Sequence, residues 1–228
     1  MIELIKKIFE EKDFVVKKDN YHKQEYYFCM RYTESNFDFF VVLTIKKEDI
    51  NLEKFNDWSA LLINKITTDN PIAGIDKNLS MIMLLEDESD SKTLNKLINK
   101  IEEDPYYFKK YVLTYTKQQK EKLSKLTLNK SIIREIEEIV SDKEKFSEFK
   151  KISGDMSELK NNLYSLISKT FIKLPFLRVP IEKEELTNLS EKIRSQITDN
   201  DASYLDVSLR LSSNAPDLPE ILQALGVE

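Results

Sequence analysis

The sequence is poor in the residues that most often carry chemistry. Its 228 residues include three glycines, one cysteine and one histidine. Three glycines do not support a glycine-rich phosphate loop, and no Walker-type motif occurs, so ATP hydrolysis is not expected. Cys29 has no partner for an internal disulfide, which fits a reducing compartment. His22 lies in a predicted polar turn, where an exposed side chain is the simpler interpretation and a catalytic base the alternative.

The chain also lacks excess positive charge and long apolar runs. Its net charge is −5, with 41% hydrophobic and 33% charged residues, which indicates a packed core under a charged surface. An acidic balance argues against a protein whose main task is to bind nucleic acid. Met1–Glu11 is amphipathic and charged, so no signal peptide is predicted. No apolar run is long enough to cross a bilayer. We therefore expect a cytoplasmic protein with no membrane partner.

Hydrophobic periodicity in the first half of the sequence predicts an α/β (α+β) fold. The pattern indicates three helices and four strands. In chain order they are helix Met1–Lys12, strands Phe14–Lys18, Glu25–Tyr32 and Phe37–Ile45, helix Asn51–Thr67, strand Leu79–Leu85 and helix Thr93–Glu103. The prediction is thus a mixed sheet of about four strands in αβββαβ order, flanked by helices.

The second half is predicted to be mainly helical. Apolar stripes at helical spacing run through residues 123–140, 159–171 and 186–197, and Ser141 with Glu144 resembles a capping box. A strict alternation at residues 205–211 predicts one short late strand, and a short helix follows it. We expect an α/β domain at residues 1–103 and a mainly helical region at 104–228, or one continuous domain.

One enzymatic alternative comes from the element order. The αβββαβ order resembles the core of PD-(D/E)xK nucleases, which bind a divalent metal with carboxylates from adjacent strands. Thr44-Ile45-Lys46 occupies the matching strand, so the lysine is present and a threonine stands where a carboxylate is needed. Glu25, Glu34 and Asp38 lie only at strand ends. A divergent metal-dependent nuclease is therefore an alternative, while no metal site or cofactor is expected.

The acidic loop that follows the last predicted strand is a second place to look for a ligand. It contains Glu86, Asp87, Glu88 and Asp90. Ligand sites favour the carboxyl ends of such strands. The loop has no glycine turn and no ordered ligand spacing, so a solvated loop is the simpler interpretation and a cation site the alternative.

An aromatic and basic block at Tyr106–Tyr115 is the most distinctive segment. It contains five aromatic residues in ten positions, and we expect it to be helical, with Asp104-Pro105 at its start. Three interpretations are open: a core seam between the two halves, a protein interface, or a surface that stacks nucleic-acid bases. The candidate partner-binding residues are Tyr106, Tyr107, Phe108, Lys109, Lys110 and Tyr111.

This block also carries a family resemblance. The sequence Glu103-Asp104-Pro105-Tyr106-Tyr107-Phe108-Lys109-Lys110-Tyr111-Val112-Leu113 resembles the central signature of the middle component of bacterial ABC-three-component systems, to which Lamassu-type phage defence belongs. The size, the α/β first half, the helical second half and the closing segment Pro216–Gly226 are also similar.

The resemblance implies a role without chemistry of its own. Such systems combine an SMC-like ABC ATPase that senses DNA with an effector that is often a nuclease, and the middle component binds both. It implies a non-catalytic adaptor that meets DNA only indirectly, through the complex. A nucleic-acid-binding module that uses the block and the lysines of residues 117–130 is the remaining alternative.

Overall fold

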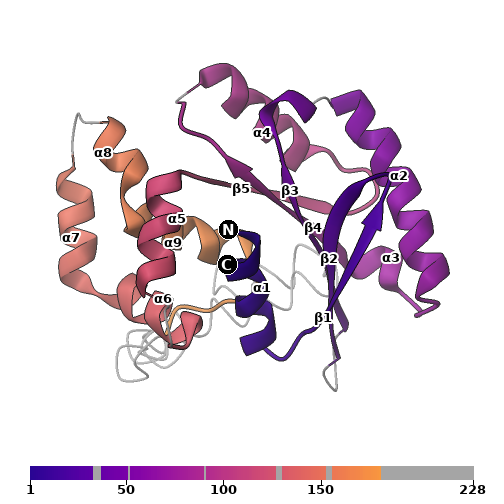
Figure 1. Cartoon of the computed structure of the whole chain (residues 1–228), viewed down its shortest axis with the longest axis horizontal. Helices are drawn as coiled ribbons and strands as arrows, with labels where there is room; N and C mark the ends of the chain where they lie inside the picture. Colours follow the sequence, from indigo (N-terminus) through magenta and orange to yellow (C-terminus); the bar gives the residue numbers. More distant parts are fainter. Residues whose placement is uncertain (33–36, 51, 90, 127–129, 153–155, 181–228) are drawn as a thin grey trace, which may run out of the picture. The chain divides into compact units, whose positions relative to one another are not determined.

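A five-stranded mixed sheet lies at the centre of the computed structural model, which describes residues 1–32, 37–50, 52–89, 91–126, 130–152 and 156–180 (Figure 1). The strands are β1 (Val15–Tyr21), β2 (Gln24–Tyr32), β3 (Phe37–Ile45), β4 (Leu79–Glu86) and β5 (Lys109–Tyr115), and they lie side by side in chain order. β1, β2 and β3 pair antiparallel, whereas β4 and β5 continue the sheet parallel to β3. The predicted α/β class and element order are confirmed, with one strand more than the four predicted.

Helices connect the parallel strands and make up the region after the sheet. In the first half they are α1 (Ile2–Glu11), α2 (Leu52–Asp69), α3 (Ile75–Asn78) and α4 (Lys92–Glu103), with the short 3-10 turn η1 (Lys47–Asp49) after β3. The second half contains α5 (Lys117–Leu126), α6 (Ile132–Ser141), α7 (Lys143–Lys151), α8 (Met156–Asn161) and α9 (Leu163–Lys173). The predicted helical second half is thus confirmed where the chain is described. In that part of the chain, no helix is long and apolar enough to span a bilayer.

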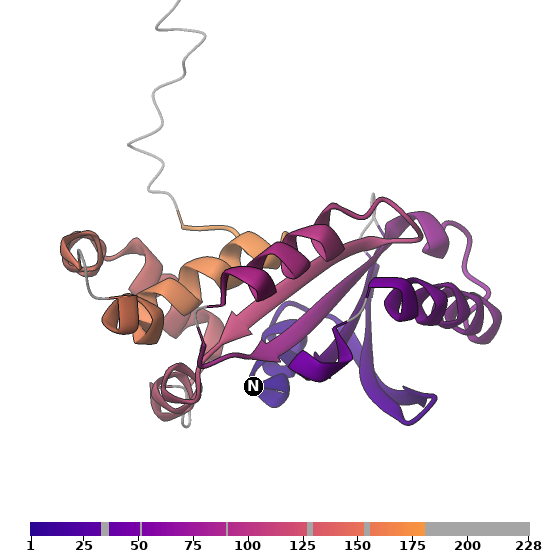
Figure 2. The same ribbon diagram turned by 90° about the horizontal axis from the view of Figure 1, so that it is seen from above.

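Side-chain alternation along the strands builds a separate core on each face of the sheet. Val41 of β3 and Met81 of β4 point to the face covered by α2 and α4. Val42 and Ile82, one position later, point to the opposite face, where α1, α6 and α9 pack (Figure 2). Both central strands are apolar on both faces because both faces are covered by helices. This explains why β3 and β4 are near-continuous apolar runs in the sequence.

Four phenylalanine rings form the centre of the core on the α1 face. Phe9 of α1 lies 4.9 Å from Phe14, 5.3 Å from Phe40 and 4.8 Å from Phe176, measured between ring centroids. The Arg31 guanidinium lies 4.4 Å from the Phe14 ring centroid, so a cation covers one side of the cluster. The cluster joins the first helix, the sheet and the segment after α9.

A carboxylate at the end of α1 caps a helix that begins about half the chain later. Glu11 accepts hydrogen bonds from the backbone N–H groups of Ile132 (3.0 Å) and Ile133 (3.1 Å), and from the Ser131 hydroxyl (2.7 Å). Burial of Glu11 opposes its ionisation, but these three donors hold the pKa of its carboxyl below the usual value. Ser131 also accepts from Arg134 N as the N-cap of α6. Because of these bonds, α1 and α6 are held together at their ends.

Several local predictions are wrong. The block expected to be helical forms β5, preceded by a turn. Asp142, not Ser141, caps α7, because the Asp142 carboxylate accepts from Glu144 N (2.9 Å) and Lys145 N (3.1 Å). The predicted polar turn at His22 is confirmed, because the first hairpin turns at His22-Lys23, and both residues have positive φ angles. The predicted helix at 186–197, the strand at 205–211 and the closing helix lie outside the described residues.

The contacts group residues Met1–Val179 into one compact unit. The division expected at residue 103 stays a prediction. β5 nevertheless joins residues 109–115 to the sheet of the first half.

Candidate functional site

The most exposed aromatic surface of the predicted block is the turn between α4 and β5, residues 104–108, which we call the tyrosine turn. The Tyr106 side chain is 63% exposed and that of Tyr107 is 47% exposed, with their ring centroids 6.4 Å apart. Tyr107 has a φ of +69°, a left-handed conformation that is uncommon for a residue with a large side chain. A bulky residue held in that conformation at the surface is a candidate contact for a partner.

A buried ion pair holds the tyrosine turn in place. The Lys110 side chain is fully buried, and its ammonium group donates to the Asp104 carboxylate (2.7 Å) and to the Tyr106 carbonyl (2.7 Å). Asp104 also accepts from Tyr106 N (3.1 Å) and from the Asn56 amide (3.3 Å). Burial opposes ionisation of Asp104, but Lys110 and Tyr106 N hold the pKa of this carboxyl below its usual value. The charge-assisted hydrogen bonds of the buried Lys110 side chain therefore hold the turn in place.

Five of the six predicted partner-binding residues fall into two groups. Tyr106, Tyr107 and Lys109 lie at the surface, whereas Phe108 and Lys110 are buried beneath the turn. Tyr111 is half-buried and packs against the core on the other face of the sheet. The structure thus brings the three exposed residues together as a surface, and the two buried residues pack beneath that surface. Their role in partner binding stays a prediction.

An open groove of about 810 Å³ borders the tyrosine turn. One wall consists of the turn with Lys109, and the other is the α3–β4 junction at residues 76–80. Glu102 and Glu103 at the end of α4 also line it. The groove is wide and mixed in charge, which suits a protein surface better than a small ligand.

The residues of the nuclease alternative do not gather in the described part of the chain. Thr44 and Lys46 are exposed at one end of β3, where Glu25 pairs with Lys18 (3.0 Å). Asp38 is at the other end of the strand and pairs with Arg31 at 2.7 Å. Glu34 lies outside the described residues. Within the described ranges, no group of three His, Cys, Asp or Glu side chains is placed to bind a metal ion.

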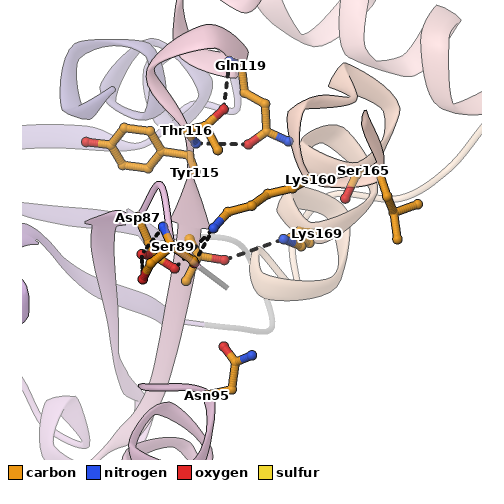
Figure 3. Close-up of a pocket in the computed structure, with 11 residues that line it drawn as sticks. Asp87, Ser89, Asn95, Tyr115, Thr116, Gln119, Lys160, Ser165 and Lys169 are labelled. Carbon is orange, nitrogen blue, oxygen red and sulfur yellow. Dashed lines mark hydrogen bonds and ion pairs between the residues drawn. The ribbon is translucent and has the colours of Figure 1, made fainter. Parts of the chain in front are cut away.

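A second, polar pocket of about 220 Å³ lies at the carboxyl ends of β4 and β5, and we call it the lysine pocket (Figure 3). Its lining side chains come from the loop after β4, the end of β5, and helices α4, α5, α8 and α9. They are Asp87, Ser89, Asn95, Thr114, Tyr115, Thr116, Gln119, Leu159, Lys160, Ser165 and Lys169. Thr116 and Gln119 form a capping box that satisfies the start of α5, because each side chain accepts from the other's backbone N–H (3.2 and 3.0 Å).

Asp87 is the buried carboxylate of the lysine pocket. It forms an ion pair with Lys47 and a second with Lys160 (3.5 Å), and it accepts from Ser89 N (2.9 Å) and the Ser89 hydroxyl (2.8 Å). Burial opposes ionisation, but Lys47, Ser89 and the charge of Lys160 hold the pKa of Asp87 below its usual value. The acidic loop therefore contributes one carboxylate that two lysines already neutralise, which leaves little attraction for a further cation.

The Asp87 pairing predicts a dependence of stability on pH. Because the pKa is lowered on folding, the stabilisation is fully present above the pKa of an unfolded aspartate, about 3.9, and is lost as pH falls through the folded-state pKa. We expect Asp87→Asn to lower the free energy of unfolding at neutral pH and to flatten its decline in acid. Urea titrations between neutral and acidic pH measure both. A variant with an acid decline as steep as that of the unmodified chain would contradict the assignment.

Comparison with known proteins gives one family match. Residues 38–139 match the family described as ABC-three component (ABC-3C) system Middle Component 1. The matched segment runs from β3 to α6, so it includes β4, β5 and the tyrosine turn. No curated protein and no solved structure matches the chain. Over this segment the chain is similar to the ABC-three-component middle component.

Proposed function

We propose that this chain is the middle component of an ABC-three-component defence system and acts as a non-catalytic adaptor. It links an SMC-like ABC ATPase to an effector nuclease, in the manner of Lamassu-type phage defence, and reaches DNA only through the complex. The observation that carries the proposal is the match over residues 38–139, which contains the tyrosine turn. Two exposed tyrosines on a rigid support are suited to this role, because a preorganised aromatic anchor loses little conformational entropy on binding.

The first experiment is co-expression with the adjacent genes. We expect the chain to co-purify with an SMC-like ATPase and an effector encoded beside it, and to remain bound during size-exclusion chromatography. A chain that elutes as a monomer beside both folded partners would refute the adaptor role. Cleavage of plasmid DNA by the chain alone with Mg²⁺ or Mn²⁺, abolished by Lys46→Ala, would support the nuclease alternative instead.

The second experiment tests the tyrosine turn itself. Tyr106→Ala combined with Tyr107→Asn removes both rings while asparagine tolerates the positive φ at position 107. We expect affinity for at least one partner to fall about tenfold or more, the loss typical of a binding hot spot. Co-purification and surface plasmon resonance measure the loss.

The chain offers a matched control for this change. Tyr32 and Phe37 are a second exposed ring pair, 50% and 48% exposed with centroids 5.5 Å apart. Tyr32→Ala with Phe37→Ala should leave partner affinity unchanged, and thermal melts should show that both double variants fold. Equal affinity for the unmodified chain and the Tyr106/Tyr107 variant would exclude the turn as the contact, even where assembly itself is observed.

A further inference from the structure

Lys169 is the lysine of the pocket that forms no ion pair with a carboxylate of the described residues. Its ammonium group lies 3.5 Å from the Thr114 hydroxyl, and no ion pair to it is formed by any described residue. The neighbouring lysines each form an ion pair, Lys160 with Asp87 and Lys173 with Glu102 at 2.5 Å. Figure 3 shows Lys160 and Lys169 approaching the loop of Asp87 and Ser89 from the same side. Among the residues that the structure describes, this half-buried cation therefore has no carboxylate in direct contact.

An unneutralised cation in a partly buried position is costly, because burial removes water that would stabilise its charge. Burial lowers the pKa of Lys169, and the positive charges of Lys160 and Lys173 lower it further, while the Asp87 carboxylate offsets part of this shift. Around Asp87, the three ammonium groups of Lys47, Lys160 and Lys169 share one carboxylate. The pocket thus has excess positive charge within a protein that is acidic as a whole.

The remaining polar groups of the pocket are suited to an oxyanion. The Thr114 and Ser165 hydroxyls line the same space as Lys160 and Lys169. Hydroxyl and ammonium donors together are the usual partners of phosphate oxygens. The volume of about 220 Å³ is below the range of about 300 to 1,000 Å³ that holds drug-sized ligands, so a phosphate with at most a small substituent is the matching size. The position at the carboxyl ends of parallel strands is where α/β sheets bind ligands.

We infer that the lysine pocket binds a small oxyanion of the phosphate class, with Lys169 as its counterion and Lys160, Thr114 and Ser165 as further donors. The site is independent of the tyrosine turn, which lies at the other end of β5. It adds a ligand-binding function to the chain whether or not the chain is an adaptor.

Inorganic phosphate is the probe for the full-length chain, in a buffer whose only other anion is chloride. We expect a saturable rise in melting temperature with phosphate concentration, because a ligand that binds only the folded state stabilises it. Calorimetric titration gives the affinity. Adenosine monophosphate, tested in parallel, distinguishes a nucleotide site, which would bind it more tightly than phosphate, from a site for an isolated oxyanion. Tighter binding of phosphate supports the inference, whereas tighter binding of adenosine monophosphate would contradict the inferred size of the ligand.

Lys169→Met provides the decisive variant. We expect it to weaken phosphate binding about tenfold or more, the loss expected when a charge-assisted bond is removed. Without phosphate, the variant should melt at the same temperature as the unmodified chain or above it, because an uncompensated charge has been replaced by an apolar side chain of similar length. Lys7→Met, which removes an exposed lysine of α1, is the matched control and should retain full affinity.

Two further outcomes would overturn the inference. The first is the absence of saturable binding by the unmodified chain. The second is an equal response to phosphate in the unmodified chain and the Lys169→Met variant, which would show a general ionic effect in place of a site. Since the variant is expected to fold at least as well as the unmodified chain, a loss of binding is not explained by unfolding.

Discussion

Lys110→Met is expected to lower the free energy of unfolding by about 3 to 5 kcal/mol, the usual cost of removing one partner from a buried ion pair. The Lys110 side chain is 0% exposed and that of Asp104 is 8% exposed, so the remaining carboxylate would be left almost without water. The Tyr106 carbonyl would lose its ammonium donor as well. Urea unfolding followed by circular dichroism measures the change.

The preceding residue of the same strand is the control for this prediction. Lys109 points to the opposite side of β5 and is exposed, with its ammonium group 5.4 Å from the Tyr111 ring centroid. Lys109→Met should change stability by no more than about 0.5 kcal/mol. A double-mutant cycle of Lys110→Met with Asp104→Asn should give a clear coupling energy. Similar losses for the Lys109 and Lys110 variants would show that the pair does not hold the turn.

Phe9→Ala is expected to lower the free energy of unfolding by about 3 to 5 kcal/mol, the range for truncating a buried phenylalanine to alanine. Phe9 is 0% exposed, and its ring lies against those of Phe14, Phe40 and Phe176. The truncation leaves a cavity bounded by three rigid rings, so the surroundings have little freedom to fill it. Thermal and urea unfolding both measure the effect.

Phe146→Ala on α7 is the matched truncation at an exposed site. Phe146 is 42% exposed, and its ring centroid lies 6.0 Å from that of Tyr164. Removing the Phe146 ring should lower the free energy of unfolding by about 1 kcal/mol or less. Phe176→Ala tests the same cluster from the segment after α9, and its cost should not add to that of Phe9→Ala because the two rings are in contact. Strict additivity would mean that the four rings do not act as one cluster.

The strands of the sheet show how far the sequence predicts the fold. β3 and β4 were predictable because apolar residues occupy both faces, and α1 because Ile5, Ile8 and Phe9 follow helical spacing. β5 was missed because a lysine stands on its buried face. Phe108, Lys110 and Val112 share one face of that segment, and a charged residue at the middle position breaks the alternation that identifies a strand. The ion pair with Asp104 allows Lys110 to be buried at this position, and that ion pair is visible only in the structure.

The candidate sites, like the fold, could be predicted only in part from the sequence. The aromatic block pointed to the tyrosine turn, because its rings exceed what one buried face can hold. The lysine pocket had only one signal, the position of Asp87 after a buried strand. The lysines around Asp87, at positions 47, 160 and 169, come from η1, α8 and α9, and nothing marks them among the 35 lysines and arginines of the chain. Tertiary contacts over more than 70 positions bring Lys160 to Asp87.

The bonds from Glu11 to α6 have a consequence for the time course of folding. The first helix is synthesised early, but the groups that donate hydrogen bonds to its last carboxylate, Glu11, belong to residues 131–133. At about 5 to 20 residues per second, the ribosome needs roughly 6 to 24 s to add those 120 residues. The apolar face of α1 must remain without its final partner for that interval. The nascent chain is therefore exposed to aggregation at its N-terminal end until its second half emerges.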